Sequence, residues 1–248
     1  MANHSLAALE TALRARKLDR TLTTALPPLE RRDESALVPT SVTALDACLR
    51  GGLPRGQLSE IVGPSSSGRT TLVWQMMAAA TRRGEIVAMV DTFDRVDVAS
   101  VVAAGLDLDR LLWIRGDAIA AQGALCERTI DRALKALTLV LQAGGFACVA
   151  IDLADVPPLM LTRMPFATWL RLQRIIEGSD TVCVIVAPQP LARSAGGLTV
   201  SLTARARWAG EADRSRHVVG ADLTAHVASP RRRVEGNVRV HAVVAGTC

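Results

Sequence analysis

The stretch QLSEIVGPSSSGRT, residues 57–70, decides the fold. We predict a strand over 57–63 and a helix from Thr70 to Arg82, joined by a turn that carries Gly63 and Gly68. This order and spacing resemble the P-loop pattern G-x-x-x-x-G-K-[ST]. The glycines let the backbone curl around a phosphate with its N–H groups pointing inward, and the helix N-terminus adds partial positive charge. The stretch therefore predicts a phosphate-binding loop.

One position departs from the pattern, because Arg69 stands where the lysine belongs. Lysine offers a compact charge on a slim stem, whereas guanidinium is a broad planar fork. We expect Arg69 to reach phosphate from a displaced position. The alternative is a loop that persists only as a strand-to-helix turn. The predicted nucleotide-binding residues of the loop are Gly63, Ser66, Ser67, Gly68, Arg69, Thr70 and Thr71.

Two acidic residues end apolar segments of the chain. Asp152 closes FACVAID (146–152), where a Walker-B acid would hold Mg²⁺ through water while the Thr70 hydroxyl ligates the ion directly. ATP and magnesium are therefore the expected cofactors, with Thr70 and Asp152 as metal ligands. Asp91 closes EIVAMVD (85–91). Its role stays open between a functional acid and a strand-end acid satisfied by a helix N-terminus.

Apolar strands alternate with helical segments through the middle of the chain. Besides the strand before the loop, we expect strands over 85–91, 111–116, 146–152 and 181–187, and helices over 96–104, 121–142 and 166–177. Continuous apolar strands that alternate with helices predict an α/β fold with a parallel sheet covered on both faces. From about residue 198 the apolar residues recur with period 2. That pattern predicts an antiparallel C-terminal meander, solvated on one side.

The N-terminal part of the chain has a different character. Residues 5–19 carry Leu6, Leu9 and Leu13 on one helical face, and residues 23–41 are rich in proline and charge. A helix this short is marginal alone and must dock on something. We expect an N-terminal helix and linker over 1–38, a possible docking arm, followed by one core domain over 39–248 with its meander from about 198.

Composition narrows the class of protein. The 248 residues carry a formal charge of +5, which permits nucleic-acid binding without requiring it. Four tryptophans, three phenylalanines and no tyrosine disfavour an RNA-binding module that stacks bases on aromatic rings. The five cysteines form no CxxC pair and no zinc spacing. Without a signal-peptide pattern or an apolar run of 18 residues, the expected location is the reducing cytoplasm, away from membranes.

Taken together, these segments resemble the RecA family of recombinases. The matching stretches are TSVTALDACLRGGLPRGQLSEIVGPSSSGRTTL (40–72), MVDTFD (89–94), GLDLDRLLW (105–113), CVAID (148–152) and VCVIVAPQ (182–189), followed by the meander. The resemblance implies a RecA-like P-loop core that binds ATP between subunits and acts on DNA. It also adds Gln189 to the cofactor-binding residues, because this position matches the glutamine that senses the γ-phosphate.

The resemblance is incomplete where chemistry would occur. The glutamate that activates water in the family should follow Asp91 by two residues, and this chain has Phe93 there. Asp94 is adjacent, but a one-residue offset at a strand end changes the direction of a side chain. A water without a positioned carboxylate lacks a general base. We therefore expect ATP hydrolysis to be lost or very slow, and no catalytic residue is assigned.

The segments that would contact DNA are also altered relative to the family. Residues 153–165 carry two prolines and little charge, and the second loop, 190–197, is short. The possible DNA contacts are Arg193 and the run Arg231, Arg232 and Arg233, which could track phosphates. A solvated hairpin tip is the competing interpretation of that run.

A narrower likeness suggests partners. LRARKLDRTL (13–22), GGLPRGQLSE and SSGRTTL resemble ImuA, the RecA-like accessory protein of bacterial damage-inducible mutagenesis. That likeness implies an adaptor in the SOS response and error-prone translesion synthesis. Its expected partner is an ImuB-like polymerase homologue, with RecA or a second copy as other docking targets of the N-terminal helix. The alternative is an active DNA-dependent ATPase or recombinase. A RecA-like regulatory ATPase is a third, disfavoured by the lack of a duplicated domain.

Overall fold

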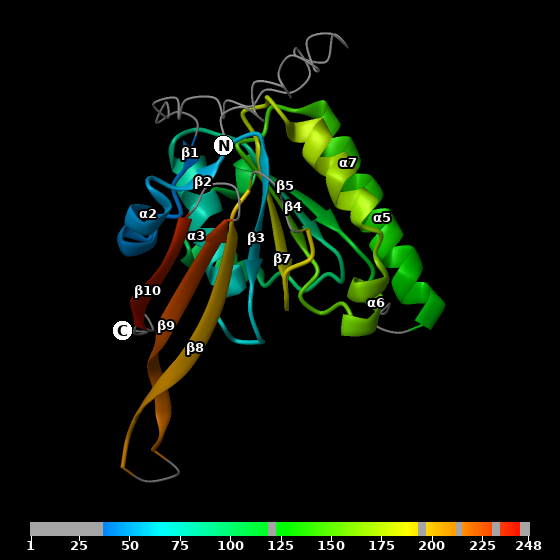
Figure 1. The fold of residues 1–248 in the computed structure, drawn as a ribbon. Helices are drawn as coiled ribbons and strands as arrows, with labels where there is room; N and C mark the ends of the chain where they lie inside the picture. Colours follow the sequence, from blue (N-terminus) through cyan, green and yellow to red (C-terminus); the bar gives the residue numbers. More distant parts are fainter. Residues whose placement is uncertain (1–36, 119–122, 193–196, 212–214, 230–233, 244–248) are drawn as a thin grey trace, which may run out of the picture. The chain divides into compact units, whose positions relative to one another are not determined.

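A mixed sheet forms the centre of the protein in a computed structural model (Figure 1). The structure describes residues 37–118, 123–192, 197–211, 215–229 and 234–243, all within the second of two units, Glu34–Cys248. The helix expected over 5–19 and the linker up to residue 36 lie outside these residues. Over the described residues the sheet has eight strands in the order β10-β9-β8-β3-β7-β6-β4-β5.

The parallel half of the sheet follows the apolar runs of the sequence. Its strands are β3 (Gln57–Val62), β4 (Val87–Asp91), β5 (Leu111–Arg115), β6 (Cys148–Asp152) and β7 (Val182–Ala187). The pairs β3–β7, β7–β6, β6–β4 and β4–β5 are all parallel. Because β4, β6 and β7 are covered on both faces, their side chains can be apolar without alternation. The predicted α/β fold class is confirmed.

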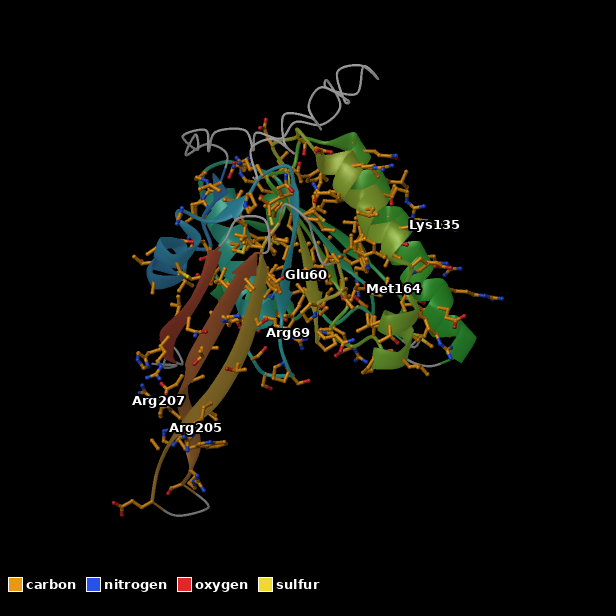
Figure 2. The ribbon with its side chains drawn as sticks, viewed as in Figure 1. Glu60, Arg69, Lys135, Met164, Arg205 and Arg207 are labelled. Carbon is orange, nitrogen blue, oxygen red and sulfur yellow. The ribbon has the colours of Figure 1, made fainter. Side chains whose placement is uncertain are left out.

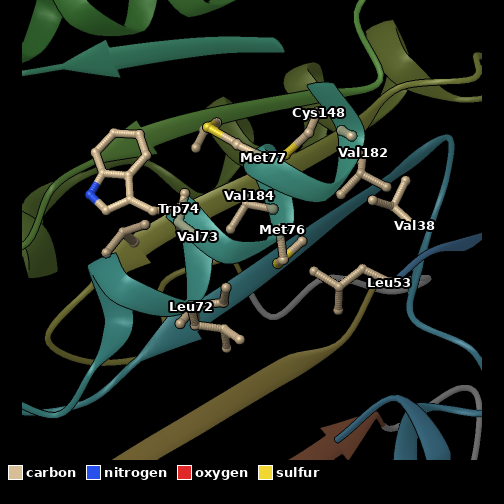
Figure 3. Close-up of a cluster of buried hydrophobic side chains, with 14 of the residues drawn as sticks. Val38, Leu53, Leu72, Val73, Trp74, Met76, Met77, Cys148, Val182 and Val184 are labelled. Carbon is tan, nitrogen blue, oxygen red and sulfur yellow. The ribbon is translucent and has the colours of Figure 1, made fainter. Parts of the chain in front are cut away.

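Helices cover both faces of this half. On one face lies α3 (Arg69–Arg82), whose Val73, Met76 and Met77 pack with Val182 and Val184 of β7 in a single buried cluster (Figure 3). On the other face, α5 (Gly123–Ala143) and α7 (Phe166–Ile176) bury apolar side chains against the same strands. The short elements α4 (Val98–Ala103) and η2 (Leu108–Arg110) connect β4 to β5.

The C-terminal strands extend the sheet beyond β3. The first of them, β8 (Thr199–Ala209), runs parallel to β3, and β9 (His217–Ser229) and β10 (Val234–Val243) continue it antiparallel. Up to Leu202, β8 alternates between buried and half-buried residues, as a one-sided strand does. From Thr203 to Trp208 every residue is exposed, so solvation on one side only is wrong for this stretch. There the C-terminal strands protrude from the sheet (Figure 1). Because β10 pairs with β9 as far as Gly220, the described two-stranded ribbon is confined to the end of β8, Trp208 and Ala209, and its partners in β9.

Two short helices and two short strands escaped the sequence analysis. The helix α6 (Pro158–Arg163) forms within 153–165, because a proline at the first helical position lacks only an N–H that would be unpaired there. The helix α2 (Thr43–Leu49) buries Leu45 and Leu49, one turn apart. The strands β1 (Leu37–Val38) and β2 (Leu53–Pro54) form a small separate sheet.

Two further observations concern boundaries and membranes. Strand β10 begins at Val234, directly after the arginine run 231–233 that the sequence analysis named as possible DNA contacts. Residues 230–233, before it, lie outside the described residues. Within the part of the chain that the structure describes, no helix is both long and apolar enough to cross a bilayer.

The packing of α5 generates a stability prediction. Leu137 is fully buried between α5 and the sheet, whereas Leu139, two residues on, is 66% exposed. Leu137→Ala should lower the free energy of unfolding by about 2–5 kcal/mol because it leaves a cavity. Leu139→Ala, the matched control on the same helix, should change it by less than about 0.5 kcal/mol. Urea unfolding followed by circular dichroism measures both, and equal effects would contradict the placement of α5.

Candidate nucleotide-binding site

The loop between β3 and α3 requires its two glycines. Gly63 has φ +153°, and a Cβ there would lie 2.2 Å from the carbonyl oxygen of Leu202 on β8. Gly68 has φ +86°, and its Cβ would lie 2.9 Å from Cδ2 of Leu223 on β9. An L side chain at either position would be strained and would collide with these strands. The loop is therefore curled tightly and flanked by the first two strands of the C-terminal extension.

The N-terminus of α3 leaves backbone donors free for a ligand. Gly68 is the N-cap and supplies no side-chain cap, and the first helical bond runs from the Leu72 N–H to the Gly68 carbonyl. The N–H groups of Arg69, Thr70 and Thr71 therefore have no acceptor within the helix. Thr70 and Thr71 are exposed, as are Pro64, Ser65 and Ser66. This arrangement suits an anion, which free N–H groups and the helix dipole attract.

Two buried side-chain atoms of the loop lack partners. Among the described residues, the buried polar side-chain atoms without a hydrogen bond are Ser67 Oγ, Arg69 Nη1, Thr92 Oγ1 and Thr129 Oγ1. Two of the four thus belong to this loop. Arg69 is only 7% exposed, and burial lowers its pKa while the charges of Asp152 and Asp155 oppose that effect. A buried cationic donor without an acceptor is costly, so an anion placed here would relieve it.

Asp152 is the acidic residue that the sequence analysis predicted as a metal ligand. It ends β6, and its Oδ1 accepts a hydrogen bond from the Ala154 N–H at 2.8 Å. Burial, reinforced by the charges of Asp91 and Asp155, raises the pKa of Asp152 to about 6, although that hydrogen bond and the charge of Arg69 act against the rise. Its carboxylate is thus held in surroundings that disfavour negative charge.

The surroundings of Asp152 fit magnesium poorly. Beside it lies a hollow of about 10 Å³ lined by Asp91, Phe93, Arg95, Asp152 and Asp155. That volume admits about one water, so a metal on Asp152 would take its other ligands from outside this hollow. Within the described residues, no three His, Cys, Asp or Glu side chains gather closely enough to hold a metal. The loop therefore fits phosphate better than Asp152 and its neighbours fit Mg²⁺.

The role of Asp91 is resolved by its partners. Its side chain is buried, and Oδ1 accepts the Arg95 N–H at 2.8 Å while Oδ2 accepts the Val96 N–H at 2.9 Å. Oδ2 also accepts the indole Nε1–H of Trp113 at 3.2 Å. Asp91 therefore ties the turn after β4 to strand β5. Of the two roles left open by the sequence, the structural one is supported, with turn amides in place of a helix N-terminus.

The position expected to hold the catalytic glutamate is apolar and closed. Phe93 is 3% exposed and belongs to the buried cluster beneath α5 and α7. Asp94, with φ +56°, turns instead toward Arg115, which donates from Nε at 2.8 Å and from Nη2 at 2.7 Å. This hydrogen-bonded pair holds the pKa of Asp94 below its usual value. The Arg115 guanidinium also lies over the Trp113 ring, 4.7 Å from its centroid.

Gln189 comes two residues after Ala187, whose carbonyl oxygen accepts the Gly63 N–H at the start of the phosphate loop. It follows β7, is exposed, and lines a groove of about 590 Å³ together with Leu161, Thr162, Met164, Phe166, Trp169, Pro190 and Leu191. No residue of the loop 63–70 lines this groove. The structure thus brings the predicted loop residues together, and Gln189 lies just beyond the end of the neighbouring strand β7, where it lines this groove. Arg193, Arg231, Arg232 and Arg233, the possible DNA contacts, lie outside the described residues.

Glu60 is a residue of the site region that the sequence analysis missed. It lies within β3, with no exposed surface, and its Oε1 accepts the N–H groups of Leu191 and Ala192 at 2.6 and 2.7 Å. Its Oε2 accepts the Thr199 hydroxyl at 3.1 Å. Figure 2 shows Glu60 in the sheet and Arg69 where β3 leads into α3. The available signal was a charged residue in the middle of a predicted strand.

Comparison with known proteins agrees with this arrangement. The model of the RecA N-terminal domain matches residues 16–152. The chain is 38% identical to Protein RecA of Salinispora tropica over 120 residues, which are 48% of this chain and 31% of the relative. It is 36% identical to Protein RecA of Clavibacter michiganensis over 124 residues, 50% of this chain and 31% of the relative.

A somewhat longer match involves a third relative. Protein RecA of Leifsonia xyli is 34% identical over 149 residues, 54% of this chain and 39% of the relative. The chain thus spans about a third of the length of the curated relatives that it matches. Because the model of the RecA N-terminal domain covers more than half of its residues, the chain belongs to the RecA family.

Proposed function

We propose that this chain is a RecA-fold accessory protein of the bacterial DNA-damage response, which binds nucleotide but hydrolyses ATP slowly or not at all. In this role it acts in translesion synthesis through contacts with other proteins, including a polymerase-like partner of the ImuB type and RecA. The observation that carries the proposal is Phe93, a buried phenyl ring at the position where the family resemblance calls for a water-activating glutamate.

The neighbouring carboxylates offer no substitute for that glutamate. A general base must reach the proton of the attacking water with an acceptor that is free to take it. Both oxygens of Asp94 accept from Arg115, and both oxygens of Asp91 accept from the turn and from Trp113. Asp152 ends β6 rather than β4, so it does not stand at the position of the family's water-activating glutamate. Hydrolysis therefore lacks an evident base on this side of the loop.

Exposed groups on the ribbon support a role in protein contacts. Trp208 is 54% exposed and Val218 is 41% exposed, on the stretch of β8 and β9 that protrudes from the sheet. Arg216 lies over the Trp208 ring, 5.5 Å from its centroid. Tryptophan and arginine are the residue types most enriched among energetically important contacts between proteins. Arg205 and Arg207 lie on the same stretch (Figure 2).

A second function, a DNA-dependent ATPase or recombinase, is favoured by a different observation. The phosphate loop keeps both glycines in their required conformation and keeps its free amides. Residues 205–248 also hold eight arginines against four acidic residues, a balance that favours phosphate backbones. Turnover separates this function from the accessory role.

We predict that phosphate release from ATP stays at the background rate, with or without single-stranded DNA, because the buried Phe93 occupies the position of the water-activating glutamate. The measurement compares the wild-type chain with Thr70→Ala. Thr43→Ala, which changes an exposed threonine of α2 outside the loop, is the control. All three should give the same rate. Turnover that DNA stimulates and that Thr70→Ala and Asp152→Ala each abolish would establish the ATPase instead.

The carboxylate of Asp94 should titrate abnormally. Because Arg115 stabilises its charged form, its pKa in the folded protein lies below the ordinary aspartate value. The stability that the pair contributes is therefore present above the unfolded-state pKa and is lost as the pH falls through the folded-state pKa. Carboxyl ¹³C NMR against pH measures this. Arg115→Gln should raise the midpoint toward the ordinary value, and an unchanged midpoint would contradict the pairing.

The proposed docking arm is tested by deletion of residues 1–25. We expect the truncated chain to lose co-purification with a polymerase-like partner, while the full chain retains it. Trp208→Ser serves as the competing variant, because Trp208 is exposed on the ribbon. Loss of binding in Trp208→Ser with unchanged binding in the deletion would place the contact on the ribbon and contradict the arm.

A further inference from the structure

The phosphate loop contains a fixed, buried cation that is short of an acceptor. Arg69 is 7% exposed, and its Nη1 has no hydrogen-bond partner among the described residues. Ser67 Oγ, two residues earlier, is buried and unpartnered in the same way. Native proteins leave few such atoms unsatisfied, and an absent ion or ligand is one of the established reasons. Both donors therefore point to an anionic group at this loop.

The negative charges that act on Arg69 include that of Asp152, which the sequence analysis predicted as a metal ligand. Asp152 and Asp155 are the carboxylates whose charges favour its protonated form. Neither forms an ion pair with Arg69 within the described part of the chain, and Asp155 pairs with Arg95 at 3.5 Å. The charges of these two acids therefore act on the guanidinium, while its Nη1 has no hydrogen-bond partner among the described residues.

We propose that the Arg69 guanidinium takes the place of the divalent cation at this loop, so that a nucleoside diphosphate or triphosphate binds without Mg²⁺. This inference rests on the proposed nucleotide binding and assigns its metal requirement. The positive charge that offsets the phosphates is then supplied by Arg69 and the N-terminus of α3. The unpartnered Nη1 and Ser67 Oγ donate to phosphate oxygens that a metal would otherwise coordinate.

Three physical differences between the two cations favour this exchange. Guanidinium presents several donors in a rigid fork that matches two phosphate oxygens, and it is weakly hydrated. Mg²⁺ requires a near-octahedral shell and releases its waters reluctantly. The hollow beside Asp152, about 10 Å³, admits about one water on the side of Phe93.

Calorimetric titration with ADP and with ATP tests the proposal, each in excess Mg²⁺ and in EDTA. For the wild-type chain we expect the dissociation constant to differ by less than about threefold between the two buffers. Arg69→Lys, which restores the slimmer cation of the usual motif, should bind at least about tenfold more weakly in EDTA than in Mg²⁺. Arg82→Lys, an exposed arginine at the other end of α3, is the matched control and should behave as wild type.

The wild-type measurements decide the proposal even if Arg69→Lys fails to fold. Wild-type binding that weakens at least about tenfold in EDTA would overturn it, and so would the absence of binding in both buffers. The result is independent of the accessory role, which turnover tests. A chain that hydrolyses ATP yet binds ADP equally well in EDTA would refute the accessory role alone. A chain that hydrolyses nothing but needs Mg²⁺ for binding would refute this inference alone.

Discussion

The carbonyl oxygen of Leu202 lies 2.2 Å from where a side chain at Gly63 would begin, and this close approach governs the site. It allows β8 to run beside β3 directly at the start of the phosphate loop. Leu223 of β9 makes the corresponding approach to Gly68. The loop is thus shaped by the C-terminal extension as well as by its own sequence. The loop that resembles the family's phosphate-binding loop therefore lies where the parallel strands meet the C-terminal strands β8, β9 and β10.

The aspartates near the loop show how environment assigns roles to one residue type. Asp91 is buried, accepts hydrogen bonds from three donors, and so links the turn after β4 to β5. Asp94 is held by Arg115 in a two-bond pair, and Asp152 is desolvated at the end of β6. Each differs from the others in partners and burial rather than in chemistry. Phe93, at the position where the family resemblance calls for a glutamate, is buried among apolar side chains.

Glu60 extends the same logic to the segment after β7. Its buried carboxylate accepts two consecutive backbone N–H groups, so the start of that short loop is bound to the centre of the sheet. A third bond, from Thr199, joins the beginning of β8 to the same carboxylate. Because the charge would be costly without these donors, loop and strand are held in one arrangement. Gln189, just before this anchor, lines the groove with Met164 and Trp169.

The sequence by itself determined the alternation of strands and helices, the strand–loop–helix unit and its glycines, since these depend on local periodicity and backbone conformation. It also located Arg69 and Phe93 as the departures from the family pattern. Three interactions could be seen only in the tertiary structure. Asp91 accepts hydrogen bonds that link the turn after β4 to β5, Asp94 pairs with Arg115, and Glu60 binds a loop more than 100 residues away. The tertiary structure also decided where α6 forms and that β8 is exposed on both faces from Thr203 to Trp208. The reason is physical: the role of a polar side chain depends on burial and on partners distant in the chain, which periodicity does not encode.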